Sequence, residues 1–117
     1  MSNGFQYAKF YIQGVNALKG LSGKELLMFI YLSNNVKMAS NELRLTRKDK
    51  DEAASIVGIK PRSVANHLSK FCKLNLMINA GGGLYIVNPS ITNRAMKSNT
   101  VQLSLNYCKL REEMFSN

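Results

Sequence analysis

The chain has little histidine or cysteine, the residues on which many catalytic and metal sites depend. His67 is the only histidine, and Cys72 and Cys108 are isolated cysteines without the spacing of metal ligands. A rolling-circle nicking enzyme of the common type needs a pair of metal-binding histidines beside its nucleophilic tyrosine, and this chain has no such pair. His67 and Cys72 border the apolar face of a predicted helix, which favours packing roles for both, and a disulfide has little support.

The chain also lacks the motifs of nucleotide-dependent and carboxylate-metal enzymes. It has no Gly-Lys-Ser/Thr phosphate loop, and the glycines at 81–83 do not follow that pattern. Asp49, Asp51 and Glu52 cluster on one short predicted helix, where Asp49 has the position of a cap and the other two that of a solvated face. We therefore predict a protein that is not an enzyme and uses no cofactor or metal.

Long hydrophobic runs are missing as well. No segment reaches the roughly 18 apolar residues that span a membrane, and the first residues show neither the basic flank nor the apolar run of a signal peptide. With 45% hydrophobic and 20% charged residues, the chain has the composition of one globular domain, residues 1–117. We predict a cytoplasmic protein.

Acidic residues are absent from the whole interval between Glu52 and Glu112. Because the formal net charge of the chain is +9, this interval forms a basic half. A basic half suggests a polyanionic partner such as nucleic acid, although charge alone also fits a basic protein without such a partner. The basic residues of the interval are Lys60, Arg62, Lys70, Lys73, Arg94, Lys97, Lys109 and Arg111.

Residues 46–75 have the pattern of a helix-turn-helix. Thr46 and Asp49 have the spacing of a cap that opens the first helix. Gly58 can adopt a positive φ and end this helix, and Pro61 favours the first turn of a second one, because its missing N–H would be unpaired there anyway. The sequence therefore predicts two helices joined by a tight turn.

The second helix, predicted from Pro61 to about Leu74, has one apolar and one polar face. Val64, Leu68 and Phe71 recur at helical spacing and would face the core. The opposite face is polar and basic and carries no acid, as in helices that enter the DNA major groove. We interpret it as a recognition helix.

Arg62 is the first candidate for a base contact, because an arginine at the start of such a helix can reach guanine O6 and N7. Asn66 lies one turn later and matches adenine N6 and N7, while a solvated helix face is the alternative for both residues. Most other candidates would bind phosphate, and Thr46 is a cap before it is a DNA ligand. The predicted DNA-binding residues are Thr46, Arg47, Lys48, Lys60, Arg62, Ser63, Asn66, Ser69, Lys70, Lys73, Arg94 and Lys97.

Residues 76–89 have the pattern of a β-hairpin, which would be the wing of a winged helix-turn-helix. Two β-rich runs flank the turn at 80–83, where the glycines supply the positive φ of a tight turn, and Asn88-Pro89 ends the second strand. The turn carries no Lys or Arg, so Arg94 and Lys97, which follow the hairpin, are candidates to supply the missing charge.

The residues before the helix-turn-helix predict a central helix and short strands. Ser22 and Glu25 form a capping pattern that opens a helix at about 23–33, and this helix is apolar nearly all round, which predicts burial. Leu43–Leu45 can form a short edge strand, and Phe5–Ile12 a strand or an arm.

The tail from Thr100 to Phe115 fits a strand by alternation, but a longer helical stripe favours a helix. The stripe would either cover the core of its own domain or pair with a second copy, and we predict a dimerisation helix at about 100–115. The predicted fold is α+β, mainly α: a winged helix-turn-helix with a two-stranded wing and a C-terminal helix. The predicted dimerisation residues are Leu103, Tyr107, Leu110 and Met114.

The order of these motifs resembles the RepL family of plasmid replication proteins from Firmicutes, over roughly Phe10–Asn93. The helix-turn-helix portion is generic, and its combination with a glycine-rich hairpin that ends in Asn-Pro is more specific. The resemblance implies a protein that binds a plasmid origin and initiates or controls replication. It is carried by Gly20–Leu27, Leu43–Asp49, Val57–Leu68 and Leu84–Pro89.

Three functions remain open from the sequence. The first is a replication initiator that binds double-stranded DNA at a plasmid origin as a homodimer and recruits host replication proteins. The second is a transcriptional regulator, such as a repressor of plasmid or phage genes, which would use the same parts. The third is a protein-interaction module, in which the face of the second helix would be covered by protein.

Overall fold

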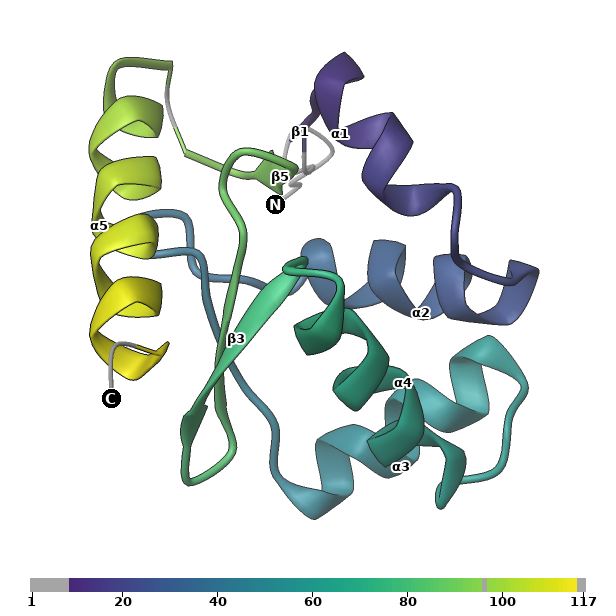
Figure 1. Ribbon diagram of the computed structural model, residues 1–117. Coiled ribbons are helices and arrows are strands. Elements are labelled where there is room, and N and C mark those ends of the chain that lie inside the picture. Colours follow the sequence, from purple (N-terminus) through teal and green to yellow (C-terminus); the bar gives the residue numbers. More distant parts are fainter. Residues whose placement is uncertain (1–8, 96, 116–117) are drawn as a thin grey trace, which may run out of the picture.

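The structure is a computed structural model, and it describes residues 9–95 and 97–115 (Figure 1). The hairpin of β3 and β4 lies between α5 on one side and α2, α3 and α4 on the other. Of Phe5–Ile12, predicted to be a strand or an arm, residues 5–8 lie outside the described residues, and Lys9–Phe10 form the short strand β1. The elements are β1 (Lys9–Phe10), α1 (Ile12–Leu18), α2 (Gly23–Ser33), β2 (Glu42–Arg44), α3 (Arg47–Val57), α4 (Ser63–Lys73), β3 (Met77–Gly81), β4 (Leu84–Val87), β5 (Thr92–Asn93) and α5 (Lys97–Phe115).

Two capping boxes open α2 and α3, as the sequence predicts. The Ser22 backbone N–H donates to Glu25 Oε1 at 2.7 Å, and the Glu25 N–H donates back to Ser22 Oγ at 3.3 Å. Thr46 and Asp49 form the same reciprocal pair at the start of α3. Each box satisfies N–H groups that have no partner inside their helix, so both starts are fixed by local sequence.

The core forms where α2, α3 and α4 meet the three-stranded sheet. Phe29 of α2 and Phe71 of α4 are both fully buried and meet edge to face, with ring centroids 5.4 Å apart. The predicted burial of α2 holds for one side of the helix, where Met28, Phe29 and Leu32 are buried. Leu27 is 51% and Ile30 is 38% exposed on the other side. Only one face of α2 is buried, since the neighbouring elements cover only that face.

The turn between α3 and α4 depends on Gly58, which caps α3 with φ 85° and donates its N–H to Ala54 O at 2.8 Å. A residue with a side chain would be strained in this left-handed conformation. Pro61 lies in the turn, two residues before the first residue of α4, rather than inside the helix as predicted. Its carbonyl still accepts the Val64 N–H, so it leads into the helix.

The hairpin belongs to an antiparallel sheet with the strand order β2-β4-β3, in which β2 is an edge strand as predicted. Gly81, Gly82 and Gly83 all have positive φ, which confirms the predicted glycine turn. The Leu45 N–H donates to Gly83 O at 2.8 Å, and a Cβ at Gly83 would lie 2.8 Å from Leu45 O. The hairpin turn is therefore held directly against the end of β2.

The C-terminal segment is a helix, as predicted, and two residues of its apolar stripe are buried against the rest of the chain. Leu103 is 7% and Tyr107 is 3% exposed, so these two predicted dimerisation residues have almost no surface to offer a second copy. Leu110 is half-buried and Met114 is exposed at the end of the helix. The Tyr107 hydroxyl donates to Asn75 Oδ1 at 2.9 Å, which ties α5 to the turn between α4 and β3.

Asn41 joins the sheet to the segment before α5. It is fully buried, with φ 59°, and its Nδ2 donates to Val87 O at 2.7 Å and to Thr92 O at 3.0 Å. These bonds hold the end of β4 and the start of β5 beside the loop before β2. A buried amide with two backbone acceptors cannot be replaced by an apolar side chain without leaving those acceptors unpaired.

We expect Asn41→Ala to lower the free energy of unfolding by about 2–4 kcal/mol, because it removes two buried hydrogen bonds and an asparagine suited to positive φ. Urea denaturation followed by circular dichroism measures this change. The control is Asn16→Ala on the exposed surface of α1, expected to change stability by about 0.5 kcal/mol or less. Equal stabilities of the two variants would contradict the role of Asn41.

Candidate nucleic-acid interface

The outer face of α4 brings together most of the residues predicted to bind DNA. Arg62, Asn66, Ser69 and Lys73 are all exposed, and their spacing of three or four residues places them on one face of the helix. Ser63 is half-buried at the edge of this face. Because Val64, Leu68 and Phe71 are buried on the opposite side, the helix has the amphipathic arrangement that the sequence predicts.

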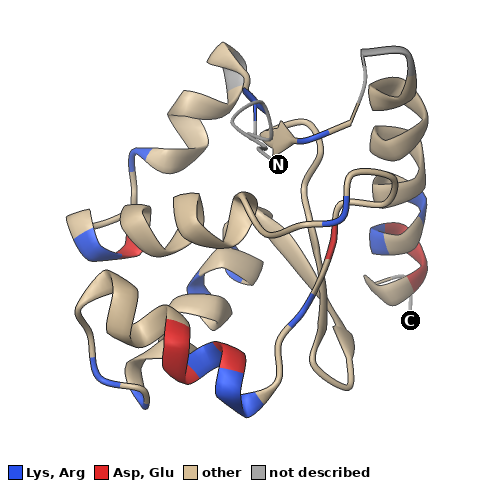
Figure 2. Ribbon diagram, turned by 180° about the vertical axis from the view of Figure 1, so that it is seen from behind, with Lys and Arg blue, Asp and Glu red and all other residues tan. Residues whose placement is uncertain are grey.

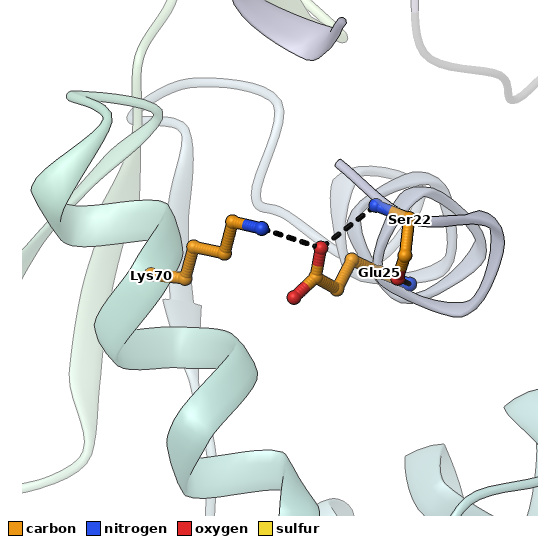
Figure 3. A network of polar contacts seen from close by, with 3 residues as sticks. All are labelled: Ser22, Glu25 and Lys70. Carbon is orange, nitrogen blue, oxygen red and sulfur yellow. Dashed lines mark hydrogen bonds and ion pairs between the residues drawn. The ribbon is translucent and has the colours of Figure 1, made fainter. Parts of the chain in front are cut away.

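Lys70 has a partner that the sequence does not reveal (Figure 3). Its Nζ lies 2.9 Å from Glu25 Oε1, the same oxygen that accepts the Ser22 backbone N–H. The lysine is therefore turned toward the start of α2, and its charge is paired with a carboxylate of the same chain while 40% of its side chain stays exposed. We leave it out of the candidate interface.

The Glu25 carboxylate is held in its charged form by two donors. The hydrogen bond from the Ser22 backbone N–H lowers the pKa of Glu25 most, and the hydrogen bond from Lys70 lowers it further. This carboxylate closes the capping box of α2 and pairs with Lys70 of α4. It therefore helps to hold α4 in place beside the start of α2.

The start of α3 presents Arg47 and Lys48 as exposed side chains. The Thr46 hydroxyl donates to Asp49 Oδ2 and accepts the Asp49 N–H, so it acts as a cap. The Thr46 backbone N–H donates to the same carboxylate, and this bond lowers the pKa of Asp49. An internal anion thus occupies the end of the helix where the sequence predicts a phosphate, and Arg47 and Lys48 are left as the candidate contacts there.

Charges of both signs alternate along the first turns of α3, whereas α4 carries no acid (Figure 2). Lys60 is exposed in the turn between these helices, next to Pro61 and Arg62. Neither the turn nor the first turn of α4 contains an acidic residue. The basic surface with no acid of its own is therefore the α3–α4 turn together with the outer face of α4.

Arg94 and Lys97 do not lie beside the hairpin turn. Arg94 follows β5 and its Nη1 donates to Asn34 O and Val36 O, so it binds the end of α2. Lys97 is the first residue of α5, which lies across the hairpin from α3 and α4 (Figure 1). The sequence misses these positions because β4 and β5 carry the chain away from the hairpin turn.

Arg44 is the residue at the hairpin turn that the sequence prediction missed. It is exposed at the end of β2, and its Nη1 donates to Gly82 O at 3.1 Å. The only signal in the sequence is its place in the short strand pattern Leu43-Arg-Leu45. That pattern predicts an exposed side chain but not which strand lies beside it.

His67 and Cys72 lie against the core side of α4, and Cys108 is exposed on α5. The His67 ring contacts Phe71 edge to face at 6.3 Å, and burial raises the pKa of the Cys72 thiol, which disfavours a reactive thiolate. Cys72 and Cys108 are both free thiols. Within the described residues, no group of three or more His, Cys, Asp or Glu side chains is placed to hold a metal ion, and no helix is long and apolar enough to cross a membrane.

We expect Glu25→Gln to lower the free energy of unfolding by about 0.5–1 kcal/mol at pH 7, because it removes the charge that Lys70 and the capping box stabilise. A depressed pKa stabilises the fold above the unfolded value near 4.3, and this stabilisation is lost as the pH falls through the folded value. The difference between wild type and variant should therefore shrink from pH 7 to pH 3 in urea denaturation. Glu112→Gln on exposed α5 is the control, and a constant difference across this range would contradict the account.

Comparisons with known proteins agree with the resemblance seen in the sequence. The model of the family described as Firmicute plasmid replication protein (RepL) matches residues 2–116, nearly the whole chain. No curated protein and no solved structure matches significantly. The chain belongs to the RepL family of Firmicute plasmid replication proteins.

Proposed function

We propose that this protein is a winged helix-turn-helix that binds double-stranded DNA at a plasmid origin and initiates replication there. In this proposal α4 enters the major groove, and the β3–β4 hairpin is the wing. The observation that carries it is the exposed, acid-free face of α4, with Arg62, Asn66, Ser69 and Lys73 in one row. Membership of a plasmid replication family supports the origin as the target.

The start of α4 is suited to an anionic partner. The boxes of α2 and α3 place Glu25 and Asp49 at those helix ends. Arg62, the N-cap residue of α4, makes no side-chain cap bond, and the first turn of α4 contains no acid. The positive end of its dipole and the Arg62 guanidinium therefore act together on approaching DNA. An arginine here can donate two hydrogen bonds to a guanine, and Asn66 one turn on can pair with an adenine.

Phosphate contacts would hold the helix in register without reading sequence. Lys60 in the α3–α4 turn and Ser63 and Ser69 on α4 flank the base-contacting residues. Arg47 and Lys48 extend the surface to the start of α3. Arg47, Lys48, Lys60 and Ser69 are exposed and Ser63 is half-buried, which leaves room for a DNA backbone.

The proposal includes no catalytic step and no cofactor. The single histidine of the chain meets a core phenylalanine edge to face. Binding of two copies to neighbouring half-sites is part of the proposal. Val101, Leu105, Met114 and Phe115 are the exposed apolar side chains of α5 available for such pairing, whereas Leu103 and Tyr107 are buried. Sedimentation of the free protein and of its Leu105→Glu variant measures this association.

The experiment that tests the function measures binding to DNA fragments tiled across the gene's own coding and flanking sequence, with salt titration and nonspecific competitor. One fragment bound far more tightly than the rest, within an origin, supports the initiator. The same result at a promoter would favour a transcriptional regulator. Uniform weak binding that is lost in moderate salt, unchanged by Arg62→Ala, would contradict site-specific recognition and favour a protein-interaction module.

Lys73 and Lys70 offer a matched pair on the same helix. We expect Lys73→Ala to weaken binding to all DNA and to flatten the salt dependence by about one phosphate contact. Lys70→Ala removes the same charge, but this lysine is paired with Glu25, so we expect a smaller effect on binding. Fluorescence anisotropy at several salt concentrations measures both. If Lys70→Ala weakens binding more than Lys73→Ala, then Lys70 leaves Glu25 and contacts the DNA in the complex.

A further inference from the structure

The hairpin turn has no charged side chain of its own, yet a guanidinium lies at it. Arg44 is opposite Leu84 in the β2–β4 register, and its Nη1 donates to Gly82 O at 3.1 Å. The side chain is exposed, and this single bond uses one of the five N–H donors of a guanidinium. The edge strand therefore supplies a cation that the sequence of the hairpin lacks.

The hairpin turn is fixed in place beside Arg44. Leu45 N–H donates to Gly83 O, and Gly83 has no space for a Cβ against Leu45 O, so the turn is seated on the end of β2. A Cβ at Gly82 would meet no atom within 4 Å, so the outermost part of the turn faces open space. The result is a thin, preorganised tip of bare backbone with one guanidinium attached.

The charges around Arg44 leave it available to a partner. No ion pair joins Arg44 to a carboxylate of the described residues. Glu42 lies two residues earlier, on the same face of β2, and is half-buried. Arg47 and Lys48 follow at the start of α3 and are exposed. Glu42 and Asp49, both half-buried, line one cavity with Arg44. The exposed charged side chains from the hairpin tip to the first two residues of α3 are therefore the basic ones, Arg44, Arg47 and Lys48.

We propose that Arg44 is the DNA-contacting residue of the wing, and that its guanidinium enters the minor groove beside the major groove occupied by α4. This inference rests on the proposed function. A minor groove is about 6 Å wide and admits only a thin element, and the glycine tip carries no side chain that would bar its approach. A narrow minor groove also has the enhanced negative potential that attracts arginine.

The test uses three 30-base-pair duplexes, one rich in A·T pairs, one rich in G·C pairs, and the G·C duplex with inosine in place of guanine. Inosine lacks the minor-groove amino group of guanine but keeps its major-groove acceptors, so this pair of duplexes isolates the minor groove. The proteins are wild type, Arg44→Ala, Arg44→Gln, Arg44→Lys and the control Lys19→Ala, which removes one exposed charge at the end of α1.

We expect Arg44→Ala and Arg44→Gln to bind the A·T and inosine duplexes about 5–20-fold more weakly than wild type, and to lose the preference of wild type for inosine over guanine. Arg44→Lys should recover part of the affinity but not the preference. Arg44→Ala can weaken binding by destabilising the hairpin turn, which would lower the melting temperature. Arg44→Gln keeps a donor for Gly82 O, so in that case it shows whether the loss of the guanidinium itself weakens binding. Lys19→Ala should retain the preference.

Two results would overturn the proposal, and they differ in what they say about the function. If wild type binds the duplexes and Arg62→Ala weakens this binding while Arg44→Ala and Arg44→Gln match Lys19→Ala, the wing role of Arg44 is wrong and DNA binding through α4 stands. If wild type binds none of the three duplexes at low salt, both the wing role and the proposed function are wrong.

Discussion

The candidate interface depends on the contact between Leu45 and Gly83. The Leu45 N–H donates to Gly83 O, and the space for a Cβ at Gly83 is filled by Leu45 O, so the hairpin turn cannot move away from the end of β2 or accept a side chain there. Thr46, the next residue, caps α3. Three consecutive residues, Arg44 to Thr46, thus connect the hairpin turn, the edge strand and the first helix of the α3–α4 pair.

A second constraint fixes α4 from the opposite side. Glu25 closes the capping box of α2 and pairs with Lys70 of α4, while Phe29 and Phe71 join the same two helices in the core. The outer face of α4 is therefore oriented by contacts on its inner and lateral faces, and none of the residues proposed to contact bases takes part in that support. Recognition residues can then change without loss of the fold.

Carboxylates that bind groups of the same chain leave fewer basic side chains free at the surface than the net charge suggests. Glu25 engages Lys70, and Asp49 occupies the N-terminal end of α3 with its carboxylate. Arg94 binds backbone carbonyls at the end of α2. What remains is Arg44 at the hairpin turn, Arg47 and Lys48 at the start of α3, and the α3–α4 turn with the outer face of α4, while α3 itself also exposes Asp51 and Glu52.

Local patterns in the sequence were sufficient to predict the helices and strands, but not to predict which residues from distant parts of the chain contact one another. The capping boxes, the Gly58 turn, the glycine hairpin and the C-terminal helix follow from short-range rules, and the structure has them where these rules predict. The partners of Lys70, Arg94 and Arg44 are 38 or more residues away in sequence, so no local rule reveals them. The exposed side of α2 was missed for the same reason, because the apolar content of a helix does not show which of its faces another element will cover.

Nuclear magnetic resonance titration with an origin-derived duplex tests the central claim most directly, because it locates the bound surface residue by residue. The account predicts amide shift changes concentrated on the outer face of α4, the first turn of α3 and the β2 end with the hairpin turn, and little change along α5. Changes confined to α5 or α1, with α4 unaffected, would contradict it.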